Sequence, residues 1–129
     1  MAYFWIAVGS ALGGMARYWC TVVGTQWFGG EFPWGTLFIN VFGSFVIGLF
    51  FTLTGVGGRF DVSNDMKLFV MVGLCGGYTT FSAFSLQTLA LFTEGHWTRG
   101  SAYIASSVVL CLIGVWAGYA LATAFNPAE

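Results

Sequence analysis

Charged side chains are scarce in this 129-residue chain, which has four Lys and Arg and five Asp and Glu residues. They make up 7% of the residues, whereas a soluble domain carries about 25%. So few charges cannot solvate the surface of a globule of this size, and the 57% of hydrophobic residues indicates a lipid bilayer as the solvent. The formal net charge of −1 leaves no basic surface for binding nucleic acid.

The side chains of common enzyme and metal sites are scarce too. The chain has a single histidine, His96. Its three cysteines are far apart in the sequence: Cys20, Cys75 and Cys111. We find no metal-ligand spacing, no Ser–His–Asp set, no glycine-rich phosphate loop and no paired carboxylates. We therefore expect that the protein is not an enzyme, and that its cysteines are reduced residues that pack in apolar surroundings.

Four apolar runs occupy almost the whole chain, and a transmembrane helix takes about 20 residues. The runs cover about residues 2–28, 34–56, 68–93 and 101–125, and glycine, proline and charged residues separate them. This pattern predicts an all-α membrane protein with four transmembrane helices in one transmembrane domain, residues 1–129. Four helices are too few to enclose a substantial pore, so an oligomer is expected.

The basic residues are almost balanced between the two sides of such a chain. Arg59 and Lys67 lie on the side of the chain ends, and Arg99 lies on the other, with His96 when it is protonated. A difference of one basic residue is a weak orientation signal. Insertion in both directions would allow an antiparallel dimer, and one orientation fixed by the lipid or the insertase is the alternative. Charge alone does not choose between them.

The third run contains the most informative segment, GLCGGYTTFSAFS, at residues 73–85. The adjacent glycines Gly76 and Gly77, followed by Thr79 and Thr80, make a poor helix centre. A break there would free backbone groups at bilayer depth, which is tolerated only where protein or a polar cavity satisfies them. Broken helices of this kind also direct carbonyls at bound ions. An intact helix whose glycine pair allows a tight crossing explains the segment equally well.

Several side chains near this segment have the chemistry to line a path for a small anion. Phe81 and Phe84 are three residues apart and share a helix face, and the positive edges of their rings could stabilise an anion without binding it tightly. Asn40 could donate its amide hydrogens, although a hydrogen bond between helices is its ordinary role. Hydroxyl groups are available on the same and neighbouring runs: Ser82, Ser85, Tyr103, Ser106 and Ser107.

Arg17 is the only formal charge well inside an apolar run. Its guanidinium could raise the concentration of anions in a water-filled vestibule, or it could snorkel to the interface. None of the predicted runs contains Asp or Glu, and Gln87, the nearest approach, cannot carry a proton. The missing carboxylate argues against a proton-coupled cation exporter.

Three blocks of the sequence resemble the Fluc (CrcB) fluoride channels of bacteria. They are GSALGGMARY at residues 9–18, FPWGTL at residues 32–37 with Asn40 and GSF at residues 43–45, and the segment at residues 76–85. The resemblance extends over essentially the full chain. It implies a passive, fluoride-selective channel that exports fluoride from the cytoplasm across the bacterial inner membrane.

The resemblance also implies an assembly and a site. The assembly is an antiparallel, dual-topology homodimer with two fluoride pores, and the third helix is broken near its middle. A structural Na+ would be held at the dimer interface by backbone carbonyls that correspond to Gly76 and Thr79. Arg17 corresponds to the vestibule arginine. The corresponding pore residues are Asn40, Phe81, Phe84, Ser82, Tyr103 and Ser107.

Three positions depart from residues that are frequent in the family: Ala83 stands for Thr, Gln87 for Glu and Cys111 for Ser. These departures concern the continuity of a polar track along the third and fourth helices, and with it the conductance. They leave the resemblance to the family unaffected.

Two other functions compete with the channel. A small multidrug-type exporter is also short, four-helical and often dual in topology, but it needs a carboxylate within the membrane. A non-transporting membrane assembly subunit would explain the GxxxG pairs at residues 9–13 and 114–118. It would not explain the segment at residues 76–85 together with Asn40 and Arg17. Ion binding or flux separates it from the channel.

Overall fold

The computed structural model describes residues 1–127, which are mostly helical. The elements in chain order are α1 (Ala2–Phe28), α2 (Trp34–Thr54), α3 (Asn64–Lys67), the π-helical stretch η1 (Leu68–Cys75), α4 (Gly76–Tyr78), α5 (Phe81–Thr93) and α6 (Trp97–Phe125). Because α3, η1 and α4 follow one another without a gap, the chain forms four long helical segments, of which the third is interrupted before α5. The expected all-α fold with four long helices is confirmed.

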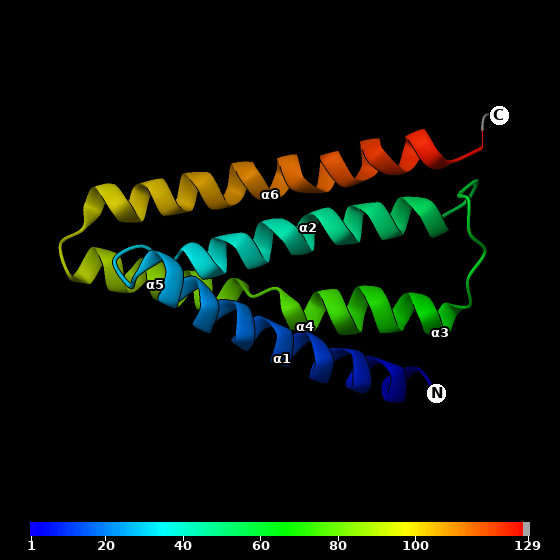
Figure 1. Cartoon of the computed structure of the whole chain (residues 1–129), viewed down its shortest axis with the longest axis horizontal. Helices are drawn as coiled ribbons and strands as arrows, with labels where there is room; N and C mark the ends of the chain where they lie inside the picture. Colours follow the sequence, from blue (N-terminus) through cyan, green and yellow to red (C-terminus); the bar gives the residue numbers. More distant parts are fainter. Residues whose placement is uncertain (128–129) are drawn as a thin grey trace.

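The four segments run alternately up and down (Figure 1). Both chain ends and the connection between α2 and α3 lie at one end of the bundle, and the two other connections lie at the opposite end (Figure 1). Three segments are long and apolar enough to cross a bilayer: Trp34–Thr54, Asn64–Thr93 and Trp97–Phe125. α1 is 27 residues long but is not among them, so its crossing of the membrane stays a prediction.

Three helix boundaries differ from those expected from the apolar runs, and the first is the start of the third segment at Asn64 in place of residue 68. α2 ends at Thr54, before the expected residue 56, because Gly55 is already extended. α6 begins at Trp97 and not at residue 101, so Arg99 and Gly100 belong to its first turn. A charged residue can be solvated at a helix end near the membrane surface, so the apolar run marks the buried part of the helix and not its start.

Glycine allows α1 to cross the third segment at backbone contact distance. A Cβ atom on Gly9 would lie 2.9 Å from the Cα of Gly73, and one on Gly77 would lie 2.6 Å from the carbonyl oxygen of Ser10. Glycine serves a second close contact between α2 and α6, where a Cβ on Gly114 would lie 2.9 Å from the Val41 carbonyl oxygen. Small residues hold helices together in lipid in this way, through close backbone packing.

The third segment is broken after its glycine pair and not at it. Gly76 remains helical, with φ −64° and ψ −38°, whereas Thr79 and Thr80 are extended, with ψ 157° and 110°. Thr80 then begins α5 as an N-cap, and its hydroxyl accepts the Ala83 N–H at 3.1 Å. Both interpretations of the sequence are therefore correct in part: Gly77 serves a tight crossing, and the helix breaks two residues later.

Candidate anion pathway

The side chain of Asn40 in α2 forms hydrogen bonds with the backbone at the helix break. Its Oδ1 accepts the Thr80 N–H at 2.8 Å, and its Nδ2 donates to the Thr80 carbonyl at 3.0 Å. In a continuous α-helix the Thr80 N–H would donate to the carbonyl of Gly76. Asn40 therefore replaces a helical partner, leaves the Gly76 carbonyl without that donor, and retains a second amide N–H.

A pocket of about 330 Å³, here called the break pocket, lies beside these hydrogen bonds. It is lined by α2, the third segment on both sides of the break, and α6. Among the described residues that line it, none is charged. The pocket brings together six of the nine residues that the sequence singled out: Asn40, Gly76, Thr79, Phe81, Phe84 and Ser107.

Ser107 lines the break pocket, and its buried hydroxyl has no hydrogen-bond partner among the described residues. The residue is only 6% exposed. Its neighbour Ser106 differs, because that hydroxyl donates to the carbonyl of Ala102 in its own helix at 2.6 Å. A buried polar group without a partner costs about 1–3 kcal/mol, so Ser107 is a donor that a bound anion could satisfy.

Phe81 and Phe84 lie on one face of α5, with ring centroids 5.3 Å apart and planes inclined by 48°. Phe84 is buried and its ring contacts that of Tyr103, with centroids 5.0 Å apart. Phe81 is 77% exposed on the isolated chain. The Phe pair therefore lies between the packed core of the chain and a surface that is open to lipid or to a second copy.

A chain of hydrogen bonds leads away from Phe84. Tyr103 is fully buried, and its ring contacts those of Phe32 and Phe84. Its hydroxyl donates to Oε1 of Gln87 at 2.8 Å. Nε2 of Gln87 donates to the hydroxyl of Thr36 at 3.0 Å. Gln87 is thus a central link between two hydroxyl groups.

The chain of hydrogen bonds ends at a second pocket of about 760 Å³, here called the loop-end pocket. Thr36 and Gln87 line it, together with the connection between α1 and α2 and the residues where α5 ends and α6 begins. Four side chains that can carry charge line it as well: Glu31, Glu94, His96 and Arg99. The two pockets therefore differ in charge, and the chain of hydrogen bonds from the loop-end pocket meets the break pocket at the ring contact of Tyr103 with Phe84.

Two of the predicted site residues lie apart from both pockets. Ser82 is exposed, and its hydroxyl lies 3.3 Å from that of Thr80. Arg17 is on α1 and partly exposed, and it forms no ion pair within the described part of the chain. The remaining predicted residue, Tyr103, connects the pockets without being part of the lining of either.

The sequence reasoning missed the roles of Thr36 and Thr80. Thr36 precedes Asn40 by four residues, so the helical repeat alone places the two on one face of α2. Thr80 comes directly before the helix that starts at Phe81, a position where a threonine N-cap is favoured. Both signals were present in the sequence, but the partners of these residues in other helices were not.

Comparison with known proteins identifies the family. Residues 4–119 match the family described as CrcB-like protein, Camphor Resistance (CrcB). The chain is 57% identical to the "Fluoride-specific ion channel FluC" of Methylocella silvestris, over 98% of this chain and 96% of the relative. Proteins with the same name from Paramagnetospirillum magneticum and Rhodospirillum rubrum are each 52% identical over 98% of both chains. The chain belongs to the CrcB/FluC fluoride channel family, whose members are multi-pass membrane channels and not enzymes.

Proposed function

We propose that this protein is a passive fluoride-selective channel that exports fluoride from the cytoplasm across the bacterial inner membrane. The observation that carries the proposal is the break pocket, in which the unpartnered Ser107 hydroxyl, the Asn40 amide and the Phe81 and Phe84 rings converge. All of these groups can present positive hydrogens or ring edges, and none is charged. The full-length similarity to proteins named for fluoride supports the same ion.

The neutral lining suits conduction of a small, strongly hydrated anion. Moving such an ion into a medium of low dielectric constant has an idealised cost of about 20 kcal/mol. Hydrogen bonds to the charged ion offset much of this cost, because they are roughly twice as strong as those between neutral groups. Conduction also requires that the ion can leave, and several weak donors satisfy this requirement better than one ammonium group.

The path of the ion runs from the break pocket along Tyr103, Gln87 and Thr36 to the loop-end pocket. The hydroxyls of Tyr103 and Thr36 can rotate to donate to a passing anion. The amide of Gln87 donates through Nε2 and has no negative charge that would repel fluoride. Gln87 therefore keeps this part of the path neutral.

The conducting unit in this proposal is an antiparallel homodimer with two pores, in which each chain is one transmembrane domain, residues 1–129, and α1 also crosses the membrane. Phe81 is 77% exposed beside the buried Phe84, so a pore at this pair needs a further wall. A second copy would supply that wall. The small difference in basic residues between the two sides allows the opposite orientations that such a dimer requires.

A structural Na+ fits the backbone at the break. The ligands would be the carbonyls of Gly76 and Thr79, both in residues that line the break pocket. The Gly76 carbonyl lacks the Thr80 N–H that a continuous helix would give it, because that N–H donates to Asn40. When bound between subunits, the ion would supply a fixed positive charge and stabilise the interface.

The two competing functions have less support. A small multidrug-type exporter needs an acidic side chain in the membrane, and the described lining of the break pocket contains none. A non-transporting assembly subunit accounts for the glycine contacts between helices but gives no role to a buried, unpartnered hydroxyl. The channel is therefore the function that the pocket supports best.

Fluoride efflux from liposomes that contain the purified protein tests this function, with chloride efflux as the matched control. We expect electrogenic fluoride efflux with little chloride leak. Well-folded protein without fluoride efflux would contradict the channel. Repeating the assay with Na+ replaced by a large organic cation tests the structural ion, for which we expect loss of the dimer or of flux.

A further inference from the structure

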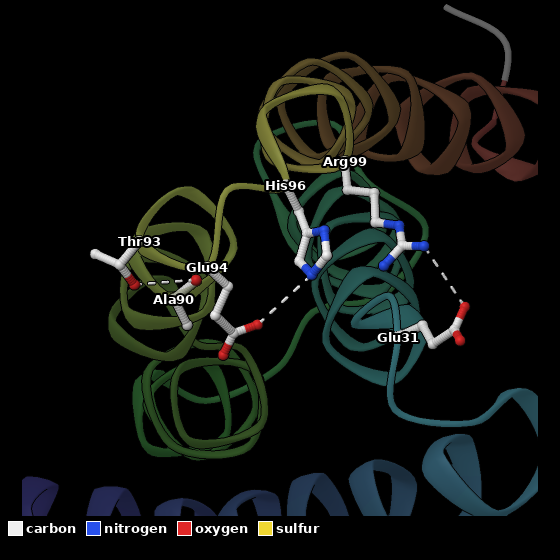
Figure 2. Close-up of polar contacts among 6 residues, drawn as sticks. All are labelled: Glu31, Ala90, Thr93, Glu94, His96 and Arg99. Atoms are coloured by element: carbon white, nitrogen blue, oxygen red, sulfur yellow. Dashed lines mark hydrogen bonds and ion pairs between the residues drawn. The ribbon is translucent and has the colours of Figure 1, made fainter.

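The loop-end pocket contains two loosely held pairs of opposite charge (Figure 2). His96 and Arg99 lie side by side at the start of α6, and Glu94 and Glu31 approach them from opposite sides (Figure 2). Nη2 of Arg99 lies 3.7 Å from Oε2 of Glu31, and Nε2 of His96 lies 3.9 Å from Oε2 of Glu94. Both distances exceed that of a good charge-assisted hydrogen bond.

These pairs are open to water. The side chains of Arg99 and Glu31 are 44% and 86% exposed, and those of His96 and Glu94 are 43% and 66% exposed. Exposed ion pairs of this kind contribute little and are screened by salt. The guanidinium of Arg99 is therefore available to a dissolved anion that displaces the carboxylate of Glu31.

Helix dipoles do not decide the sign of the potential at this end of the bundle. α2 and α6 begin here, whereas α1 and α5 end here, so two positive and two negative helix ends oppose each other. The side chains decide instead. With His96 neutral, the two carboxylates and one guanidinium give the pocket a net negative charge. Arg99 is the one permanent positive charge in the described lining of this pocket.

The pocket also lies on the way to the break pocket. Thr36 and Gln87 line it, and they are bonded to each other and through Tyr103 to the Phe84 region. Arg17 lies outside this lining. An anion that uses this chain of polar groups therefore passes Arg99 and Glu31.

We infer that Arg99 collects anions at this mouth of the channel and that Glu31 is a tethered carboxylate that competes with the anion for its guanidinium. The inference rests on the proposed fluoride channel and deepens it. The ligand is a small hydrated anion, with fluoride as the transported one. The two residues would set how often the mouth is occupied, whereas the interior groups would set which ion passes.

Opposite changes in flux are the signature of this arrangement. We expect Arg99→Gln to lower fluoride efflux and Glu31→Gln to raise it, each up to about twofold, because salt at about 0.1 M roughly halves the Coulomb energy in water of a charge about 5 Å from the ion. The assay uses subsaturating fluoride at about 0.1 M ionic strength, and both effects should vanish at about 1 M, where the screening length falls from about 10 Å to about 3 Å.

The matched controls each remove one positive or one negative charge at the other end of the bundle. Lys67→Gln and Asp65→Asn lie in α3, at the opposite end of the same chain (Figure 1), and in the proposed antiparallel dimer the partner's α3 shares the membrane face with this pocket. These controls therefore measure the effect of a charge on that face outside the pocket, and they should change efflux less than either pocket variant. A folding defect lowers flux and cannot raise it, so the increase in Glu31→Gln is the sharpest result. If both pocket variants lower efflux at every ionic strength, or both match the controls, the inference is wrong.

His96 provides a readout that does not depend on conduction, because it is the single histidine of the chain. We expect its ring NMR signals to shift saturably as sodium fluoride is added at constant pH and ionic strength. The shift should be lost in Arg99→Gln and should occur at lower fluoride in Glu31→Gln.

The two readouts separate the inference from the function. Fluoride efflux in the wild type with no His96 response and no effect of either variant would overturn the inference and leave the channel intact. A saturable His96 response that depends on Arg99, without any efflux, would overturn the channel and leave the anion site at this pocket intact.

Discussion

The break pocket and the loop-end pocket present different kinds of polar group. The break pocket offers an amide, a hydroxyl and aromatic edges, and none of its described lining residues is charged. The loop-end pocket contains two carboxylates, a guanidinium and an imidazole, all substantially exposed. One chain thus has neutral donors where the dielectric constant is low and full charges where water is present.

The difference follows from the strength of a charge in each environment. Two unit charges 4 Å apart interact by about 1 kcal/mol in water and by about 4 kcal/mol at an effective dielectric constant of 20. A guanidinium in the break pocket would hold an anion too tightly for it to leave, whereas at the loop-end pocket it only raises the local concentration. Substitutions in the interior should therefore have large effects that salt does not change, and those at the mouth should have small, salt-dependent effects.

The largest expected effect comes from Asn40→Ala. The variant removes both hydrogen bonds to Thr80, whose backbone N–H is then buried without a partner, whereas its carbonyl, as that of an N-cap, still accepts the first bond within α5. An unpaired buried group costs about 1–3 kcal/mol, so we expect a loss of about that size in stability, together with loss of fluoride efflux. Thermal unfolding in detergent and liposome efflux measure the two.

Ser44→Ala is the matched control for Asn40→Ala. Ser44 lines the same pocket, but its hydroxyl donates only to the backbone carbonyl of Asn40 in its own helix, at 2.7 Å. This variant should keep a nearly wild-type unfolding temperature. An Asn40→Ala protein that unfolds at the wild-type temperature would show that the helix break does not depend on the amide.

The next largest effect is expected for Phe81→Ile and Phe84→Ile. Isoleucine keeps an apolar side chain but removes the positive ring edge, and the loss should lower fluoride efflux about tenfold. Phe81 is the cleaner test because it is 77% exposed and its loss disturbs little packing in the chain. Phe51→Ile, at an exposed position of α2 outside the break pocket, is the control. Unchanged efflux in both pore variants would argue against a role of the rings.

The helices were predictable from the sequence because the signals are local. Apolar runs and intervening glycines and prolines depend on neighbouring residues, and they predicted the four segments. The break was predicted within a few residues, but its position at Thr79 and Thr80 depends on the amide of Asn40 across the helix interface. A sequence read along one helix contains no information about that partner.

The site was predictable as a set of residue types and not as a set of contacts. Phe81, Phe84, Asn40 and Ser107 were singled out and do meet in one pocket. The link from Gln87 to Thr36 joins residues 51 positions apart, and it depends on how α5 is rotated against α2. The pairing of Glu31 with Arg99 depends on the connections that precede α2 and α6, whose geometry no periodic pattern encodes.

Ser107→Ala should separate stability from flux. Removing a buried hydroxyl without a partner is expected to leave stability unchanged or to raise it by about 1 kcal/mol. It also removes a donor to the anion, worth about 0.5–1.5 kcal/mol, so efflux should fall about two- to tenfold. Ser106→Ala, whose hydroxyl already has a partner in its own helix, should change neither. A loss of stability in Ser107→Ala would mean that the hydroxyl has a partner in the folded protein.

The smallest interior effect is expected for Gln87→Glu at a pH where the new carboxyl group is protonated. The Tyr103 hydroxyl can still donate to the new carboxylate, and the Thr36 hydroxyl can donate in place of accepting, so the chain of hydrogen bonds survives with one bond reversed. The added negative charge should lower efflux by more than about tenfold when it is ionised, because charges interact more strongly at the low dielectric constant of the interior. Efflux should therefore be close to wild type where the carboxyl group is protonated and should fall as the pH rises through its titration.

Gln87→Leu is the control, since it breaks both bonds without adding charge. If Gln87→Glu and Gln87→Leu lower efflux equally at every pH, continuity of the hydrogen bonds matters at this position and charge does not. The contrast between a neutral interior and a charged mouth would then no longer hold at Gln87.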